Sequence, residues 1–371
     1  MKKTVLLCCL MLISALAGCI TDNISEKIDD GGLIANPNAD MELVIVTYDI
    51  SGLTDELLSN FENETGYSVE LLKLDDAGSV LDHLLLNNGT QIADLALGLD
   101  NTYLQFAIDA GVFVEHNANI SNISADALEP YNGPYAVPFD MGSICLNYDS
   151  AALDDLNMTA PESLWNLTES DWNGKVAIPS PITSSPGRAF MTATTDYFAK
   201  DADNETTWTD WWSSMVANDL IITSGWTEAY ATHYSGGYGV WNDDHIGDAH
   251  ITVSYCHSPG VEASFNGNST SSVALALDYA TFHQVEYAGV IDGGNALAAN
   301  AFIEYLLSEE VNAKMPSENY MYPVIEGLDL PEADGYRYHS LVPNQHAEVT
   351  PEQIAANMET WLEQWNDAVS A

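Results

Sequence analysis

Positive charge is scarce in this sequence. Its 371 residues contain 9 Lys plus Arg against 55 Asp plus Glu, a formal net charge of −46 at pH 7. Nucleic-acid binding depends on basic patches that neutralise phosphates, so this composition argues against a nucleic-acid partner. Most of the acidity is expected to form a solvated surface, and such a surface also attracts cationic ligands.

Enzyme and metal-site motifs are missing as well. The chain has no Gly-x-Ser-x-Gly, His-Glu-x-x-His or Gly-Lys-Ser/Thr sequence. The histidines and aspartates of residues 233–257 lack the spacing of a zinc site, and the acidic run at 201–205 lacks the glycine of a calcium loop. The sequence therefore predicts no enzyme, no metal site and no cofactor.

Cysteine is rare after residue 19, where Cys145 and Cys256 are the two that remain. Each stands in an apolar, strand-like run. The two either form one disulfide or pack separately as small hydrophobic residues.

The N-terminal apolar run, residues 5–17, is shorter than the roughly 20 residues that span a bilayer. It follows two lysines and ends at Leu-Ala-Gly-Cys19, the pattern of a lipoprotein signal. A retained membrane anchor is the alternative. We expect residues 1–19 to be a removed signal and Cys19 to carry the lipid. Residues 20–40, rich in Asp, Asn and Gly, would then be a flexible tether at the outer face of the cytoplasmic membrane.

Strand-like and helix-like patterns alternate after residue 40, which predicts an α/β fold with a parallel sheet. The first strands are expected at residues 43–48, 67–74 and 92–99, and the first helices at 53–64, 79–86 and 103–110.

The length after the signal, about 350 residues, exceeds one ordinary hydrophobic core and indicates two lobes. We predict lobe 1 from residues 41–137 and 284–371, and lobe 2 from residues 138–283. Two crossing strands would join them, with a ligand cleft between the lobes.

Candidate binding residues follow from this topology. Ligands of open α/β sheets meet the carboxyl ends of strands, which selects Tyr48, Asp49, Asp100 and Asn101. Aromatic residues beside turns either have structural roles or form a cage for a flat or cationic ligand. These aromatic residues are Trp226, Tyr230, Tyr255 and Tyr320.

Residues 183–187 offer hydroxyl and backbone N–H groups at the start of a predicted helix. Ser184, Ser185 and Gly187 either cap that helix or bind an anion. Arg188 follows directly, and it either pairs with surface carboxylates or helps to hold a phosphate.

Several of these segments together resemble the periplasmic thiamine-binding proteins of bacterial ABC importers, which have the type II substrate-binding fold. The resemblance covers nearly the whole chain after the signal. The segments that carry it are residues 46–49, 93–101, 137–140, 183–187, 225–230, 254–255 and 321–324, together with Trp361 and Trp365.

The resemblance implies that Tyr48, Trp226, Tyr255 and Tyr320 surround the ligand and that Ser184 faces its hydroxyl or phosphate end. Asp49, Asp100 and Asp140 are the acidic groups suited to the charged thiazolium. The chain departs from the family pattern at Tyr320, where a tryptophan is usual, and at Cys256 and His257, where hydroxyl residues are usual.

The sequence thus predicts a monomeric, lipid-anchored binding protein that delivers thiamine or a thiamine phosphate to an ABC importer permease. A polyamine or a ferric ion is the alternative ligand on the same fold. An extracellular enzyme or adhesin built on that fold is the alternative class.

Overall fold

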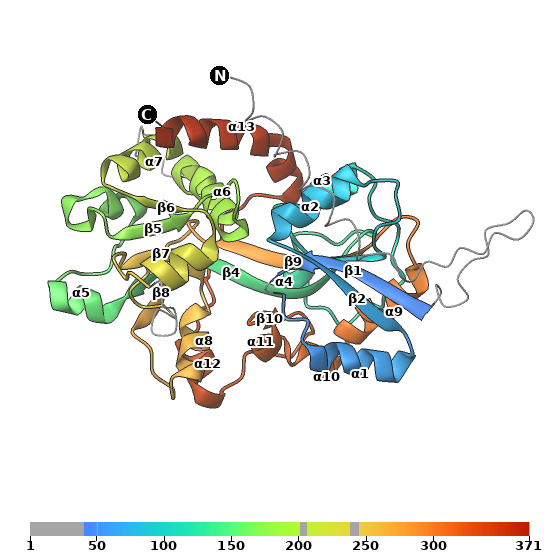
Figure 1. The fold of residues 1–371 in the computed structure, drawn as a ribbon. Coiled ribbons are helices and arrows are strands. Elements are labelled where there is room, and N and C mark those ends of the chain that lie inside the picture. Colours follow the sequence, from blue (N-terminus) through green and yellow to red (C-terminus); the bar gives the residue numbers. More distant parts are fainter. Residues whose placement is uncertain (1–40, 50, 201–205, 238–244, 371) are drawn as a thin grey trace, which may run out of the picture. The chain divides into compact units, whose positions relative to one another are not determined.

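A mixed β-sheet runs through the part of the chain that the structure describes, residues 41–49, 51–200, 206–237 and 245–370. In this computed structural model, ten strands of the described residues pair in the order β2-β1-β3-β9-β4-β7-β5-β6, with β8 and β10 also paired to β4 (Figure 1). The strands are β1 (Glu42–Tyr48), β2 (Ser68–Leu74), β3 (Leu95–Asp100), β4 (Val137–Asp149), β5 (Val176–Pro179), β6 (Ile221–Thr223), β7 (Ile251–Tyr255), β8 (Ser272–Leu275), β9 (Phe282–Val290) and β10 (Tyr322–Pro323).

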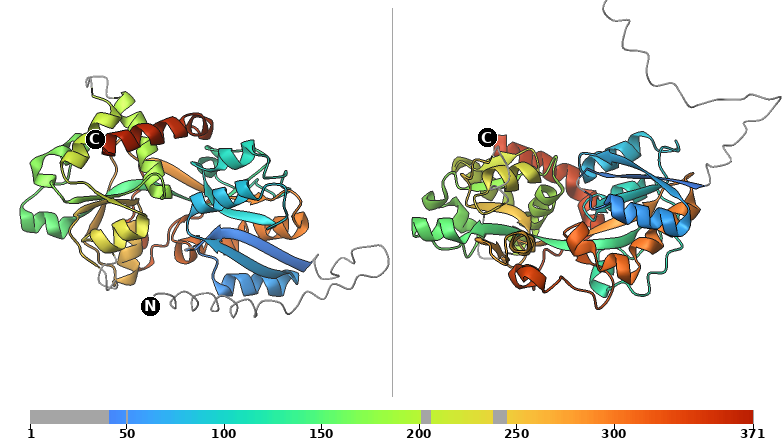
Figure 2. Two further views of the ribbon diagram at one scale, coloured as in Figure 1. Left: turned by 45° about the horizontal axis from the view of Figure 1, so that its top comes forward. Right: turned by 60° about the horizontal axis from the view of Figure 1, so that its bottom comes forward.

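Helices cover both faces of this sheet (Figure 2). They are α1 (Asp55–Thr65), α2 (Ala77–Leu86), α3 (Leu104–Asp109), α4 (Ala125–Leu128), α5 (Ser150–Leu156), α6 (Ser185–Lys200), α7 (Trp208–Ala217), α8 (Ser258–Phe265), α9 (Ala296–Leu306), α10 (Glu309–Asn312), α11 (Met315–Glu318), α12 (Tyr336–His339) and α13 (Pro351–Ser370). A π-helix, Glu228–His233, follows β6.

The first lobe begins with the predicted alternation of strands and helices. β1 pairs in parallel with both β2 and β3. Helix α1 starts where the Thr54 hydroxyl accepts a hydrogen bond from the Leu57 N–H, and it buries Leu57 and Phe61. The six elements predicted before residue 111 are confirmed, with bounds that differ by a few residues.

Two strands, β4 and β9, carry the chain across the middle of the sheet. β9 pairs antiparallel with β3 on one side and with β4 on the other, and β4 pairs with β7 along its second half. Residues 273–290 read as one long β-rich run in the sequence, but the structure divides them into β8 and β9. The prediction of two crossing strands is confirmed.

Separate apolar cores lie at the two ends of these crossings. In the first lobe one cluster lies under α1 and α9 and another under α2 and α3. The second lobe is centred on Trp211 and Trp212 of α7, which are fully buried and contact Phe190 of α6.

The C-terminal helix differs from the predicted lobe boundary. The sequence assigned residues 284–371 to lobe 1, yet Trp365 of α13 packs edge-on against Trp212, with ring centroids 5.8 Å apart. Ile354 and Met358 join the same core. Figure 1 shows α13, in red, lying over α6 and α7. The apolar stripe of α13 matches the aromatic core of the second lobe, so the chain returns there after building part of the first.

Cys145 and Cys256 form a disulfide, which decides between the two alternatives left open by the sequence. Cys145 lies in β4 beside Ser254 of β7, and Cys256 directly follows β7. The bond therefore ties the end of β7 to β4, next to Tyr255.

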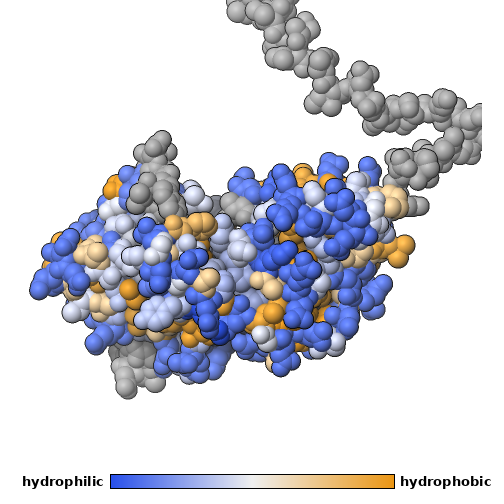
Figure 3. Space-filling model, turned by 90° about the horizontal axis from the view of Figure 1, so that it is seen from below, coloured by the Kyte–Doolittle hydropathy of each residue, from blue (hydrophilic) through white to orange (hydrophobic). Residues whose placement is uncertain are grey.

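The face shown in Figure 3 is mostly hydrophilic, with apolar groups scattered over it, as the acidic composition predicts. None of the helices within the described residues is long and apolar enough to cross a membrane. The predicted signal, the lipidation of Cys19 and the tether of residues 20–40 lie outside the described residues.

Candidate functional site

Three acidic residues lie side by side across the middle of the sheet. Asp100 at the end of β3 is paired in register with Glu286 of β9, and Glu286 is paired with Asp140 of β4. Their side chains are 1%, 5% and 0% exposed, respectively. Like charges on directly opposite strand positions destabilise a sheet. A row of three buried carboxyl groups, here called the carboxylate row, is therefore a feature that stability alone does not favour.

Irregularities in the strands bring the row into register. The β3–β9 pairing shifts between Leu97 and Leu99, and the β4–β9 pairing shifts between Pro138 and Asp140. Gly98, at the first shift, has φ +94°, and a Cβ atom there would collide with the ring of Tyr48. Bulges of this kind re-aim side chains next to functional sites. Gly98 thus lets Tyr48 lie against β3 at the edge of the row.

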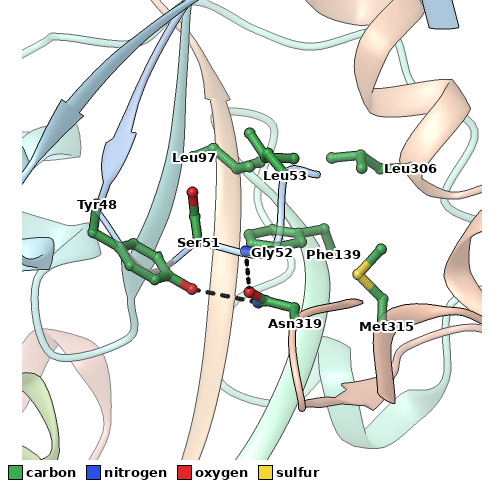
Figure 4. A pocket seen from close by; sticks show the side chains of 9 residues that line it. All are labelled: Tyr48, Ser51, Gly52, Leu53, Leu97, Phe139, Leu306, Met315 and Asn319. Carbon is green, nitrogen blue, oxygen red and sulfur yellow. Dashed lines mark hydrogen bonds between the residues drawn. The ribbon is translucent and has the colours of Figure 1, made fainter. Parts of the chain in front are cut away.

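A hydrogen-bond network connects the row to β1 and to the residue that follows α11. The Tyr48 hydroxyl donates to Glu286 Oε2 at 2.7 Å. Asn319 follows α11, and its Nδ2 group donates to Asp140 Oδ2 at 2.5 Å and to the Tyr48 hydroxyl at 3.3 Å. The backbone N–H of Gly52 donates in turn to Asn319 Oδ1. Figure 4 shows Tyr48 and Asn319 pointing toward one another beside a small cavity lined by apolar side chains.

Burial dominates the electrostatics of the row. It raises the pKa of Asp140 to about 8, although the hydrogen bond from Asn319 opposes the shift. Burial and then the charge of Asp140 raise the pKa of Glu286 well above its usual value. The pKa of Asp100 is raised less decisively, since Ser185, Thr102 and Arg188 all favour its charged form. Adjacent carboxyl groups that are this deeply buried resist ionising together.

Two acceptor atoms at the row lack hydrogen-bond partners among the described residues. Asp140 Oδ1 is fully buried and has no partner within that part of the chain, and the same is true of Gln284 Oε1. Gln284 lies two residues before Glu286 on β9, and its Nε2 group donates to the Tyr255 hydroxyl at 3.1 Å. A buried polar atom without a partner costs about 1–3 kcal/mol, so both atoms are suited to a donor or a cation supplied by a ligand.

Aromatic rings lie next to the row on the side of the second lobe. Trp226 stacks on Tyr230, with centroids 4.9 Å apart and planes 14° apart, and lies edge-on to Tyr255 at 6.5 Å. Trp226 Nε1 donates to Ser254 Oγ at 2.9 Å, which fixes the indole on β7. Tyr230 belongs to the π-helix, a local irregularity that is frequent at functional sites.

A buried carboxyl group supports these rings. The Tyr230 hydroxyl donates to Glu262 of α8, which also accepts from Thr270 and Ser272. Burial raises the pKa of Glu262 to about 7.

The start of α6 contacts the row through Asp100. Ser185 Oγ donates to Asp100 Oδ2, so a carboxylate lies at the positively polarised end of the helix. Ser184 Oγ accepts from the Gly187 N–H at 3.3 Å and caps the helix, as in the simpler of the two predictions. Gly187 is required because a Cβ atom there would collide with the carbonyl of Pro179.

Arg188 is buried, so the alternative of a surface arginine paired with carboxylates is wrong. Its guanidinium lies 4.1 Å from the centre of the Tyr103 ring, and Nε donates to the Pro181 carbonyl at 3.3 Å. Tyr103 belongs to the first lobe and α6 to the second, which makes this a contact between lobes. The role of Arg188 toward a phosphate stays a prediction.

Comparison with known proteins identifies the family and the fold of this chain. Residues 56–333, three quarters of the chain, match the family model described as bacterial extracellular solute-binding protein. The chain belongs to that family. The structure of a periplasmic thiamin binding protein superposes on this solute-binding protein with a TM-score of 0.73, at 27% identity, covering 89% of this chain and 96% of the other. The type II two-lobed fold is thereby confirmed.

Relatives found by sequence are also named as thiamine-binding periplasmic proteins. The solute-binding protein is 28% identical to the thiamine-binding periplasmic protein of Escherichia coli K12 over 84% of this chain and 86% of that one. It is 25% identical to the protein of the same name from Brucella melitensis, over 91% and 95%. Iron-bound HitA from Pseudomonas aeruginosa, at 15% identity and a TM-score of 0.67 over 88% of this chain and 99% of the other, shares the fold alone.

The structure brings together most of the predicted site residues of this solute-binding protein. Those at or next to the carboxylate row are Tyr48, Asp100, Asp140, Ser185 and Tyr255. Trp226 contacts Tyr255 and stacks on Tyr230, so these two rings extend from the row into the second lobe. Asn101 is adjacent but has a structural role, since its side chain bonds the backbone of Val285 and His283 in β9.

Two of the predicted site residues make none of their described contacts with the row. Asp49 is exposed in the turn after β1, where its carbonyl accepts from Lys73 Nζ at 3.3 Å. Tyr320 is 44% exposed, and its ring lies edge-on to that of Phe265, with centroids 6.0 Å apart. Its carbonyl accepts from His257 Nε2, a ring nitrogen that must therefore carry the proton. The departure from tryptophan at Tyr320 coincides with this turned-away position.

Sequence reasoning missed Glu286, Gln284 and Asn319. A usable signal existed for the first two, because Gln and Glu at alternate positions of an apolar crossing strand are rarely buried without a reason. Asn319 gave no signal beyond its place in an aromatic turn. Its contact with Asp140 joins residues 179 positions apart, so it depends on the tertiary fold.

Among the described residues, the carboxylate row included, no group of three or more His, Cys, Asp or Glu side chains is arranged so that it could hold a metal ion. His233 pairs with Asp248 at 2.8 Å, and His250 bonds Ser235. Asp243, Asp244 and residues 201–205 lie outside the described residues.

Proposed function

We propose that this solute-binding protein captures thiamine outside the cytoplasm and delivers it to an ABC importer. The observation that carries the proposal is the buried carboxylate row beside the rings of Tyr48, Tyr255 and Trp226. Relatives and a solved structure that carry thiamine in their names support it.

The chemistry of thiamine fits this arrangement. Its thiazolium ring bears a permanent positive charge, which is attracted by carboxylates and by aromatic faces. Its pyrimidine is flat and can stack on an indole or phenol ring. Binding requires no covalent step, so we propose a carrier rather than an enzyme, without cofactor.

Phosphorylated thiamine is proposed as a second ligand. The start of α6, with Ser184, Ser185 and Arg188, would face the phosphate, but Asp100 lies at that helix end in this structure. Binding of a phosphate there would need Asp100 to move or to take up a proton.

We further propose that Cys19 carries a lipid and that residues 20–40 tether a monomeric binding unit to the outer face of the membrane. The lipoprotein pattern of the sequence supports this location. The periplasmic location in the names of the relatives agrees with it.

Titration of the purified chain with thiamine tests the function. Trp226 stacking should quench tryptophan fluorescence, and calorimetry should show one site. Spermidine and ferric ion, the alternative ligands, serve as competitors in the same assay. Saturable binding of either competitor, with none of thiamine, would contradict the proposal and assign the carboxylate row to that cation.

A further inference from the structure

The carboxylate row holds more negative charge than its surroundings neutralise. Within the described residues neither Asp140 nor Glu286 has a lysine or arginine within the distance of an ion pair. Arg188 acts on Asp100, at the end of the row. Two adjacent buried carboxyl groups without a cation retain a proton between them.

We propose that Asp140 and Glu286 form the subsite for the positive charge of the ligand, and that each captured cation expels the proton that this pair shares. The proposal rests on the function proposed above, and it identifies the residues of that site that recognise the positive charge of the ligand. The proton leaves to solvent, and the cation takes over its role of neutralising the pair.

Unpartnered atoms support a ligand at this point independently of the acidity. Asp140 Oδ1 and Gln284 Oε1 are buried, and no described residue bonds to either atom. The amide of Gln284 contacts both the Tyr255 hydroxyl and Glu286. Gln284 thus connects the pair to Tyr255 of the second lobe.

The groups around the pair leave it as the main source of titration. Tyr48 from β1 and Tyr255 from β7 have pKa values raised by burial and stay neutral. Asn319, after α11, is uncharged and bonds Asp140. Burial raises the pKa of Asp100 on β3 as well, against the hydrogen bonds from Ser185 and Thr102 and the charge of Arg188, and its ionised form adds negative charge beside the pair. No other element contributes a charge that acts on the pair within the described residues.

The sign of the pH dependence follows from this geometry. A cation binds best to the ionised pair, whereas a falling pH places a proton on it. Affinity for a permanent cation should therefore fall as the pH is lowered through the raised pKa of the pair, by up to about tenfold per pH unit. A neutral ligand of the same shape gains nothing from ionisation and should show the opposite trend or none.

Calorimetry on the intact chain tests the inference directly. Thiamine is titrated at about pH 7 in two buffers of different ionisation enthalpy, and the difference in observed heat gives the protons released. We expect a release of about one proton per thiamine. The control ligand is the isostere in which a neutral thiophene replaces the thiazolium, for which we expect no release and weaker binding.

Substitution locates the effect. Glu286→Gln and Asp140→Asn should each abolish the proton release and weaken thiamine binding about tenfold or more, with little change for the neutral isostere. Glu363→Gln, on the exposed face of α13, is the matched charge control and should behave like the wild type. Because a variant can misfold, the two-buffer measurement on unaltered protein decides independently.

Two results would overturn the inference. Thiamine binding without proton release in the wild type, or isostere binding as tight as that of thiamine, removes the cation subsite while leaving the proposed function intact. Failure of thiamine to bind at all overturns both proposals.

Discussion

Ser185 at the start of α6 donates a hydrogen bond to the carboxylate of Asp100 at the end of β3, and so joins the two lobes. One helical turn later, Arg188 lies over the ring of Tyr103. The carboxylate of one lobe thus satisfies the helix end of the other, which is also the position where a phosphate would be expected.

This contact leads to a prediction about closure. The lobes are linked by two strands and should rotate about them, so thiamine should make the chain more compact in small-angle scattering. Without ligand, a Ser185→Ala/Arg188→Ala variant should have a larger radius of gyration than the wild type. Identical scattering with and without saturating thiamine would argue against a hinge.

The same helix start should set the preference for phosphate. Asp100→Asn removes the competing negative charge, and the affinity for thiamine monophosphate relative to thiamine should rise about tenfold. Arg188→Gln should lower this ratio, because it removes a charge-assisted donor. Calorimetry with thiamine and its two phosphorylated forms measures the ratio. If neither variant alters it, Arg188 has a packing role only.

The aromatic rings of the second lobe should contribute directly to affinity. Trp226→Ala or Tyr255→Ala should weaken thiamine binding by about 1–3 kcal/mol through lost stacking and cation–π contact. Tyr338→Ala, an 85% exposed position, is the control. Normal binding by either site variant, with an unchanged circular dichroism spectrum, would show that the ring is structural.

Glu262 should make stability depend on pH. Burial raises its folded-state pKa to about 7 from an ordinary value of 4.5, so the native chain keeps a proton that the unfolded chain has lost. Its contribution to the free energy of unfolding is complete below about pH 4.5 and is lost as the pH rises through about 7. Glu262→Gln should therefore be more stable than the wild type at about pH 8, by on the order of 1–3 kcal/mol.

Urea unfolding over this pH range measures the difference between the two proteins, which should shrink toward about pH 5. Glu363→Gln corrects for the general relief of negative charge. Parallel stability curves for wild type and Glu262→Gln would mean that the carboxyl group does not titrate in this range.

The disulfide should matter for stability more than for recognition. Cys145 and Cys256 close a loop with a sequence separation of 111 residues. Replacing both with serine should lower the free energy of unfolding by about 3–5 kcal/mol. Thermal unfolding with and without reductant checks this. A loss of thiamine affinity in protein that is still folded would instead place the bond in the site, through Tyr255.

Local patterns in the sequence were sufficient for much of the fold. The alternation of strands and helices before residue 111 and the crossing strand at 137–149 follow from short-range periodicity, which the structure retains. Tyr48 and Asp100 could be selected because a strand end is visible in the sequence. The pairing of Cys145 with Cys256 could not, since two apolar strand-like settings look alike whether or not the sulfurs meet.

Only the tertiary structure decided which polar groups lie together in one buried site. The row forms because two register shifts bring Asp100, Glu286 and Asp140 level on three neighbouring strands, of which β9 lies far along the chain from β3 and β4. The same holds for α13. The sequence pattern of its apolar stripe is compatible with packing on either lobe, and in the tertiary structure it packs on Trp212 of the second lobe. Periodicity reports which face of an element is apolar. The neighbour that covers that face, and the charge that it brings, depend on contacts that no local pattern encodes.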